Sequence, residues 1–209
     1  MRVVRLPGLV PYAEGHALQR ELVEQRIRGE IPDTVILLEH APVITLGRKA
    51  GAEASVIDAG DWPVVRVERG GDATWHGPGQ LVAYPIVALE GERRDLHRHL
   101  RQLEEAVIAL LGDLGLNGVR DPRNTGVWLP SADGPPRKVC SIGIACRRWV
   151  SWHGLALNVD PDPAAFLRLR PCGFDPDVMT RLADHLDPCP SVDALAGPLA
   201  DALGRALET

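Results

Sequence analysis

The sequence Arg69-Gly70-Gly71-Asp72-Ala73-Thr74-Trp75-His76-Gly77-Pro78-Gly79-Gln80 places four glycines, a proline and a histidine within twelve residues. Apolar, β-branched runs precede it at 64–68 and follow it at 81–87, and both are typical of strands. A simple hairpin connection needs only about two to five residues. We therefore predict a long loop that grips a ligand with its cation, hydroxyl and imidazole groups. An ordinary loop with a structural histidine is the alternative.

Length and composition predict one domain over residues 1–209, with room for a small C-terminal lobe. The hydrophobic content of 45% is ample for a core, and no apolar run approaches a membrane span. The N-terminus lacks a signal-peptide pattern, so we expect a cytoplasmic protein without a membrane partner. A formal charge of −5 argues against a nucleic-acid partner.

The order of apolar patterns predicts an α/β domain in which helices flank a mixed β-sheet. Asp95 is positioned to cap a helix that ends near residue 111. Gly197-Pro198 is expected to break one short helical turn, which Ser191 caps, and to start a last helix. Strands are predicted at 3–10, 34–40, 43–49, 64–68, 81–87, 127–129, 138–146 and 152–159, and further helical segments at 12–30, around Phe166 and at 175–182.

Lysine is rare in this chain: of 23 basic residues, only Lys49 and Lys138 are lysine. A genomic preference for arginine explains the count. A lysine kept against that preference can still mark a site that needs an amine able to lose its proton, which arginine cannot supply. Lys138 opens a predicted strand. By itself it reads as a solvated strand-end residue; beside a cysteine it could stabilise a thiolate or accept a proton.

The four cysteines have no metal-binding spacing, so we expect free thiols and no metal. Cys172, between Pro171 and Gly173, lies in a predicted loop before a helical segment, where a thiol can be exposed and activated; a loop cysteine without a role is the alternative. Cys140 and Cys146 share a strand face and are predicted to be buried packing residues, and Cys189 a bystander.

The histidines fall into two groups. One group stands at the ends of apolar runs, where a structural imidazole is the commoner outcome: His40, His76 and His153. The other group lies in helical or polar contexts and is predicted to be on the surface: His16, His97, His99 and His185.

Several blocks closely resemble the signature of the lipoyl(octanoyl) transferase family. They occur in the family's order and cover most of residues 35–180. The blocks are Leu38 to Gly47, Arg69 to Gln80 with Tyr84-Pro85, Lys138 to Gly143, Trp152 to Asn158, and Pro171-Cys172-Gly173.

This resemblance implies the catalytic fold of biotin and lipoate protein ligases. It also implies transfer of an octanoyl group from acyl carrier protein to a lysine of lipoyl domains, in 2-oxoacid dehydrogenases and the glycine cleavage protein, without a cofactor. Cys172 would form the acyl thioester, and Lys138 would lower its pKa or shuttle its proton, so the two should lie side by side. The implied substrate-binding residues are Arg69, Gly70, Gly71, Asp72, Ala73, Thr74, Trp75, His76, Ser141, Ile142, Gly143, Gly154, Leu155 and Ala156.

Three alternatives stay open at this point. An ATP-dependent lipoate or biotin ligase shares the implied fold but would not need a Cys–Lys pair. A non-catalytic acyl-binding module would tolerate loss of Cys172. A thioesterase would release the fatty acid to water. Trp75 is bulkier than the residue in some family members, and we expect it to influence the preferred chain length.

Overall fold

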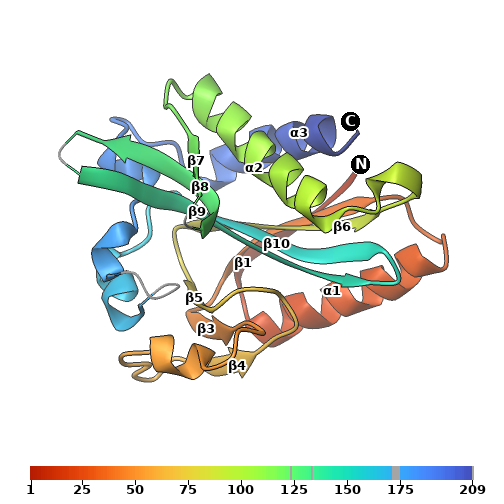
Figure 1. Cartoon of the computed structure of the whole chain (residues 1–209), viewed down its shortest axis with the longest axis horizontal. Helices are drawn as coiled ribbons and strands as arrows, with labels where there is room; N and C mark the ends of the chain where they lie inside the picture. Colours follow the sequence, from red (N-terminus) through yellow and green to blue (C-terminus); the bar gives the residue numbers. More distant parts are fainter. Residues whose placement is uncertain (123, 133, 171–174, 209) are drawn as a thin grey trace.

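A seven-stranded mixed sheet forms the centre of the molecule (Figure 1). The computed structural model describes residues 1–122, 124–132, 134–170 and 175–208. Only the β1–β2 pair is parallel, and every other neighbouring pair in this sheet is antiparallel. The strand order is β1 (Arg2–Val10), β2 (Thr34–His40), β6 (Gln80–Ala88), β10 (Val150–Asn158), β9 (Gly134–Arg147), β8 (Asn124–Ser131) and β7 (Val119–Asp121).

Helices cover both faces of this sheet, as the sequence predicted (Figure 1). Alternate residues of β2 point to opposite faces: Val35 and Leu37 join one core cluster, and Ile36 and Leu38 join the other. The first cluster packs under α2 (Leu96–Asp113) and α3 (Val192–Glu208), and the second packs under α1 (Tyr12–Ile27). Strands buried on both faces explain the continuous apolar runs.

The glycine-rich segment is not one long loop, and that prediction is wrong. Residues Ala73–His76 form β5, which pairs antiparallel with β3 (Val43–Leu46), while β4 (Val64–Arg66) pairs parallel with β3 on its other edge. The three strands make a small second sheet beside α1 (Figure 1). The partner of β5 lies about thirty residues away, so the local pattern of glycines could not reveal the strand.

The segment after the predicted nucleophile loop also differs from the prediction. In place of one helix over 175–182, the chain has two short 3-10 turns, Pro176–Val178 and Leu182–Asp184. Between them Met179 forms a parallel bridge with Lys138, which requires extended backbone. The described residues contain further 3-10 turns at Ala52–Ser55, Gly91–Arg93 and Pro163–Arg168.

The last helix is continuous, so the predicted break at Gly197-Pro198 is wrong. Pro198 lies inside α3. Leu195 and Leu199, on either side of it, are both buried in the core under α2. Proline removes one helical hydrogen bond, but burial of the apolar face on both sides of it holds the helix together. No helix of the described residues is long and apolar enough to cross a membrane.

Candidate active site

A cavity of about 260 Å³ lies between the glycine-rich segment, β9 and β10. Lys138 lines it, together with every predicted substrate-binding residue except Trp75 and, from outside the prediction, Tyr12, Tyr84, Leu100, Asn124, Thr125, Ile144 and His153. The structure therefore brings together predicted residues that are up to about ninety positions apart in the sequence, from Arg69 to Ala156. Trp75 lies elsewhere: it packs against Phe166 and Trp62, with ring centroids 5.6 and 5.8 Å away.

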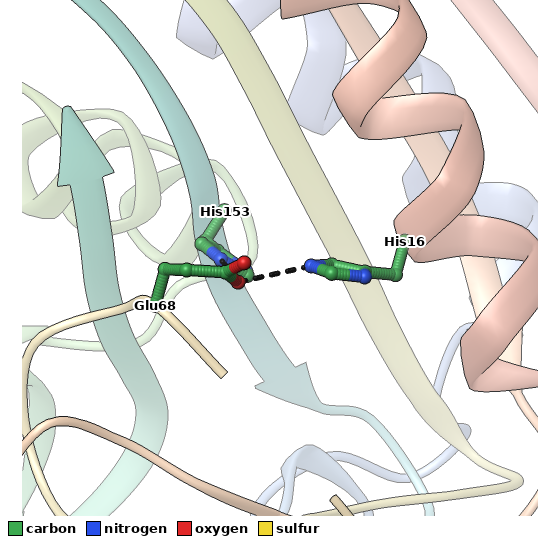
Figure 2. Close-up of side chains that lie close together, drawn as sticks. All are labelled: His16, Glu68 and His153. Atoms are coloured by element: carbon green, nitrogen blue, oxygen red, sulfur yellow. Dashed lines mark hydrogen bonds and ion pairs between the residues drawn. The ribbon is translucent and has the colours of Figure 1, made fainter. Parts of the chain in front are cut away.

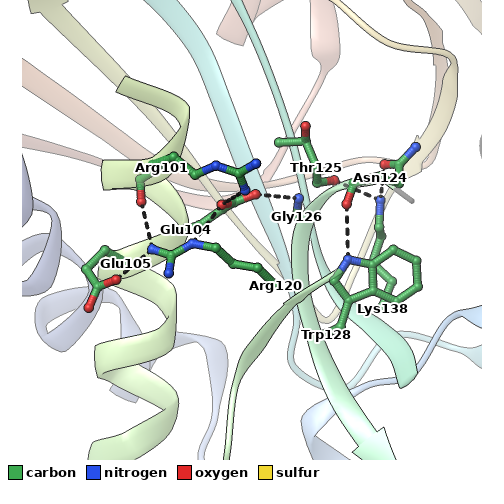
Figure 3. Close-up of polar contacts among 9 residues, drawn as sticks. All are labelled: Arg101, Glu104, Glu105, Arg120, Asn124, Thr125, Gly126, Trp128 and Lys138. Carbon is green, nitrogen blue, oxygen red and sulfur yellow. Dashed lines mark hydrogen bonds and ion pairs between the residues drawn. The ribbon is translucent and has the colours of Figure 1, made fainter. Parts of the chain in front are cut away.

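Lys138 is buried in the wall of this cavity, so its interpretation as a solvated strand-end residue is wrong. Its Nζ donates to Asn124 Oδ1 at 2.6 Å and to the Thr125 carbonyl at 3.0 Å (Figure 3). The same nitrogen stands 4.9 Å from the centre of the Trp128 ring. These contacts fix the amine at one place in the cavity.

Two features of the turn beside Lys138 explain its position. Gly126 has φ +136°, and a Cβ there would come within 2.5 Å of the Cys140 carbonyl and 3.4 Å of Lys138 Nζ. Glu104 of α2, almost fully buried, accepts hydrogen bonds from the Gly126 N–H at 3.1 Å and from Arg120 Nε at 3.0 Å (Figure 3). The sequence analysis did not single out Glu104. An acidic residue on the apolar face of an amphipathic helix indicates a buried carboxylate with polar partners, so the pattern could have identified it.

Arg69 holds the glycine-rich segment against β3. Its guanidinium donates to the Thr45 carbonyl at 2.9 Å, to Thr45 Oγ1 at 2.8 Å and to the Asp72 carbonyl at 2.8 Å. The Gly70 N–H donates to the Ile144 carbonyl at 2.8 Å, which joins the segment to β9. A Cβ on Gly143 would lie 3.0 Å from the Gly70 carbonyl oxygen, so glycine allows this close approach.

Asp72 anchors the same segment from the other side. Its carboxylate accepts hydrogen bonds from Lys49 Nζ at 2.6 Å, Ser55 Oγ at 2.8 Å and the Ala73 N–H at 2.8 Å. Burial by itself would raise the pKa of Asp72. The three hydrogen-bond donors together have the larger effect, so the pKa of Asp72 lies below its ordinary value. The second lysine of the chain, Lys49, therefore has a structural ion pair at this place.

Burial keeps the imidazole of His76, which lines the cavity, and that of its neighbour His40 uncharged at neutral pH. His40 donates from Nδ1 to the Val10 carbonyl at 2.9 Å, so its Nε2 accepts from the Tyr84 hydroxyl at 2.8 Å; burial lowers its pKa to about 4. His76 Nδ1 lies 2.7 Å from Gln80 Oε1, and burial, with the nearby Arg69 cation and unfavourable interaction with His40 when both would be protonated, holds its pKa well below the usual range. These imidazoles therefore add no charge to the cavity, whose lining also includes Arg69, Asp72 and Lys138.

Two of the predicted surface histidines lie inside the fold instead. His99 is buried, because its place three residues after Leu96 and four before Leu103 puts it on the apolar face of α2. His16 is half-buried, and its Nε2 lies 3.0 Å from Glu68 Oε2. His16, Glu68 and His153 together form a cluster whose ligand atoms could hold a metal ion. His97 and His185 are exposed, as predicted.

The described cysteines are free thiols and poor nucleophiles. Burial raises the pKa of Cys140 to about 12 and raises the pKa of Cys146 and of Cys189 as well. Cys140 is buried as predicted, but Cys146, next to the last residue of β9, is exposed, so its predicted burial is wrong. Cys172 lies outside the described residues, and with it the predicted proximity of Cys172 to Lys138.

The described chain on both sides of residues 171–174 is fixed by backbone pairing. On the upstream side, Leu169 bridges to Val56, and the Arg170 N–H donates to the Ser55 carbonyl at 2.8 Å. On the downstream side, the bridge from Met179 and the Thr180 N–H, 3.0 Å from the Lys138 carbonyl, attach the chain to the strand that carries Lys138.

Comparison with solved structures identifies the fold. The lipoate protein ligase of Thermoplasma acidophilum, a bipartite enzyme, superposes with a TM-score of 0.72 over 99% of this chain and 83% of that one, at 18% identity. The biotin protein ligase of Aquifex aeolicus superposes with a TM-score of 0.60 over 99% of this chain and 70% of the other, at 12% identity. The predicted biotin and lipoate ligase fold is confirmed.

Comparison of sequences identifies the family. A model of the lipoyl protein ligase A/B catalytic domain matches residues 11–204. An octanoyltransferase of Rubrobacter xylanophilus is 50% identical over 192 residues, which cover 88% of this chain and 83% of that protein. Enzymes of this kind are acyltransferases, and the predicted family is confirmed. The chain belongs to the octanoyltransferases of the lipoyl protein ligase A/B catalytic-domain family.

Proposed function

We propose that this protein transfers an octanoyl group from octanoyl-acyl carrier protein to a lysine of a lipoyl domain, through a thioester on Cys172. The acceptors are the lipoyl domains of 2-oxoacid dehydrogenases and the glycine cleavage protein, and the reaction takes place in the cytoplasm, where thiols stay reduced. The observation that carries the proposal is the burial of Lys138 in a cavity lined by the implied substrate-binding residues.

The reaction needs two acyl exchanges and no cofactor. The Cys172 thiolate attacks the thioester carbonyl of the donor, and the oxyanion collapses as the donor thiolate leaves and takes up a proton. The neutral amine of the acceptor lysine then attacks the Cys172 thioester. Cys172 leaves as a thiolate, and the new amide nitrogen loses its extra proton. Because the energy of the thioester drives the amide bond, ATP is not required.

Lys138 acts on Cys172 in one of two ways. As a cation it stabilises the thiolate, and as a neutral amine it carries the thiol proton. Two observations support Cys172 as the nucleophile. The pKa of each described cysteine is raised, and the segment that follows Cys172 pairs with β9 at Lys138. A lysine-to-arginine variant separates the two roles, since arginine keeps the charge but cannot release a proton.

The cavity suits an acyl chain of medium length. Leu100, Ile142, Ile144, Leu155 and Ala156 contribute apolar surface to it. An octanoyl chain has about seven carbons beyond its carbonyl, and at ~0.8 kcal/mol for each buried carbon their burial contributes about 6 kcal/mol. That term is large enough to favour octanoyl over much shorter donors.

Intact-mass measurement of the full chain tests the proposal. We expect exposure to octanoyl-acyl carrier protein without ATP to add the mass of one octanoyl group, and an apo lipoyl domain then to remove it and gain the same mass. Cys172→Ser should abolish the adduct. Cys146→Ser, a change at an exposed thiol, is the matched control and should load normally.

The alternatives predict other results in the same experiment. An ATP-dependent ligase gives transfer only with ATP and free octanoate. A non-catalytic binding module retains its behaviour in the Cys172→Ser variant and forms no adduct. A thioesterase loses the adduct to water as fast as to the lipoyl domain. Any of these three outcomes overturns the proposal.

A further inference from the structure

We propose that His16, Glu68 and His153 form a binding site for one divalent transition-metal ion of the zinc type. The three residues come from α1, from the segment between β4 and β5, and from β10, and their side chains meet beside the acyl cavity (Figure 2). This site goes beyond the proposed acyl transfer, which uses no metal, and it does not rest on that proposal.

The spacing of the three ligand atoms fits a small ion. Glu68 Oε2 lies 3.0 Å from His16 Nε2 and 3.6 Å from His153 Nε2, and all three atoms lie within 4.8 Å of one another (Figure 2). Tetrahedral ligands that are each ~2.1 Å from a zinc ion stand ~3.4 Å apart. The two measured contacts lie on either side of that value.

His153 supplies an independent indication. Its side chain is only 2% exposed, and its Nε2 has no hydrogen-bond partner among the described residues although it faces Glu68. Its backbone has φ +56°, a conformation that is uncommon for a residue other than glycine, and its N–H donates to Gln19 Oε1 at 3.0 Å. The fold thus holds a buried imidazole nitrogen in the cluster without a hydrogen bond to satisfy it.

The donor set selects the class of ion. Two imidazoles and one carboxylate are typical ligands of Zn²⁺, Co²⁺ and Ni²⁺, whereas Ca²⁺ and Mg²⁺ prefer sets made of oxygen ligands. The Glu68 side chain is half exposed, so a fourth position is open to water or to another ligand. Three protein ligands with an open position form the arrangement seen in many zinc sites that exchange a ligand.

A bound ion would connect the glycine-rich segment to the rest of the fold. Glu68 directly precedes Arg69 and Gly70, which line the acyl cavity, and His153 lines it too. Glu68 also lines a neighbouring hollow of about 520 Å³ that shares Gly70 and Ile144 with the acyl cavity. The ion would therefore clamp the start of this segment to α1 and β10, and we expect it to raise the thermal midpoint of the protein.

Calorimetric titration of the metal-free full chain with Zn²⁺ tests the site, and Co²⁺ reports the coordinating atoms through its visible absorption. We expect one ion per chain with nitrogen and oxygen ligands, and at least a ten-fold loss of affinity in each of Glu68→Gln and His16→Asn. The matched controls are Glu14→Gln and His97→Asn, which change exposed residues outside the cluster and should bind normally. Thermal melts without metal establish that each variant is folded.

Two results would overturn the site. One is the lack of saturable binding by the unmodified protein. The other is equal binding by the unmodified protein and by Glu68→Gln. Such binding would include a cobalt complex that shows thiolate absorption and is lost when the cysteines are replaced. Because octanoyl loading is measured separately by mass, failure of the metal site leaves the proposed transfer standing, and failure of transfer leaves the metal site standing.

Discussion

Replacement of His99 by leucine should stabilise this protein, although it changes a fully buried residue. His99 is 1% exposed on α2, and neither of its ring nitrogens has a hydrogen-bond partner among the described residues. Burial lowers its pKa to about 4, although Asp33 opposes that shift. Leucine has a similar size and no polar atom, so His99→Leu removes a polar group that the core does not satisfy.

The magnitude has two parts. At neutral pH, relief of an unsatisfied buried polar group is worth about 1–3 kcal/mol. In acid, the unfolded chain binds a proton at His99 near an ordinary pKa of about 6.5 while the folded chain does not, so the stability contributed by the neutral group falls as the pH drops from about 6.5 toward 4. At about pH 5 that loss amounts to about 2 kcal/mol, and His99→Leu escapes it.

Urea unfolding at about pH 7.5 and about pH 5 measures both parts. We expect His99→Leu to be more stable than the unmodified protein at the higher pH, and the difference to grow by about 2 kcal/mol at the lower pH. His97→Leu, at an exposed position on the same helix, controls for the change in composition. A His99→Leu protein that is less stable at neutral pH, or whose advantage does not change with pH, would refute the reasoning.

Three further substitutions test the packing around the cavity. Asn124→Ala removes the acceptor 2.6 Å from Lys138 Nζ and should slow acyl loading at least ~10-fold in single-turnover mass measurements, while urea unfolding reports separately the cost to stability of a buried amine that has lost one acceptor. Glu104→Gln keeps an acceptor but loses the buried charge, and should lower the free energy of unfolding by about 1–3 kcal/mol in urea. Gly154→Ala places a Cβ 2.3 Å from the Ala83 carbonyl and should lower the thermal midpoint, at a cost of about 1–3 kcal/mol.

The elements that the sequence predicted correctly have their causes within a few residues. Asp95 caps α2 because its Oδ1 accepts from the N–H groups of His97 and Arg98 at 2.8 and 3.1 Å, and both donors lie within three positions of the cap. The apolar run 34–40 forms a buried strand whichever strands it pairs with. Local patterns of this kind were enough to predict most strands of the main sheet and the helices that flank it, although the short strand β7 was not among them.

The elements that were predicted wrongly depend on distant partners. Met179 takes extended backbone because Lys138 lies beside it, about forty residues upstream. Pro198 stays helical because Leu195 and Leu199 are buried under α2, far away in the sequence. Proline and glycine signals describe what the chain prefers alone, and tertiary contacts worth several kcal/mol override such preferences.

Pairing with a distant strand also decides which residues of the glycine-rich segment reach the cavity. Thr74 lies opposite Thr45 and Trp75 opposite Ile44 in the pairing of β5 with β3, so successive side chains point to opposite faces. Thr74 and His76 line the cavity, while Trp75, on the opposite face, is buried against Phe166; Ala73, at the start of β5, also reaches the cavity. A motif that is continuous in the sequence therefore groups residues with unlike tasks, and the strand pairing that separates them is visible only in three dimensions.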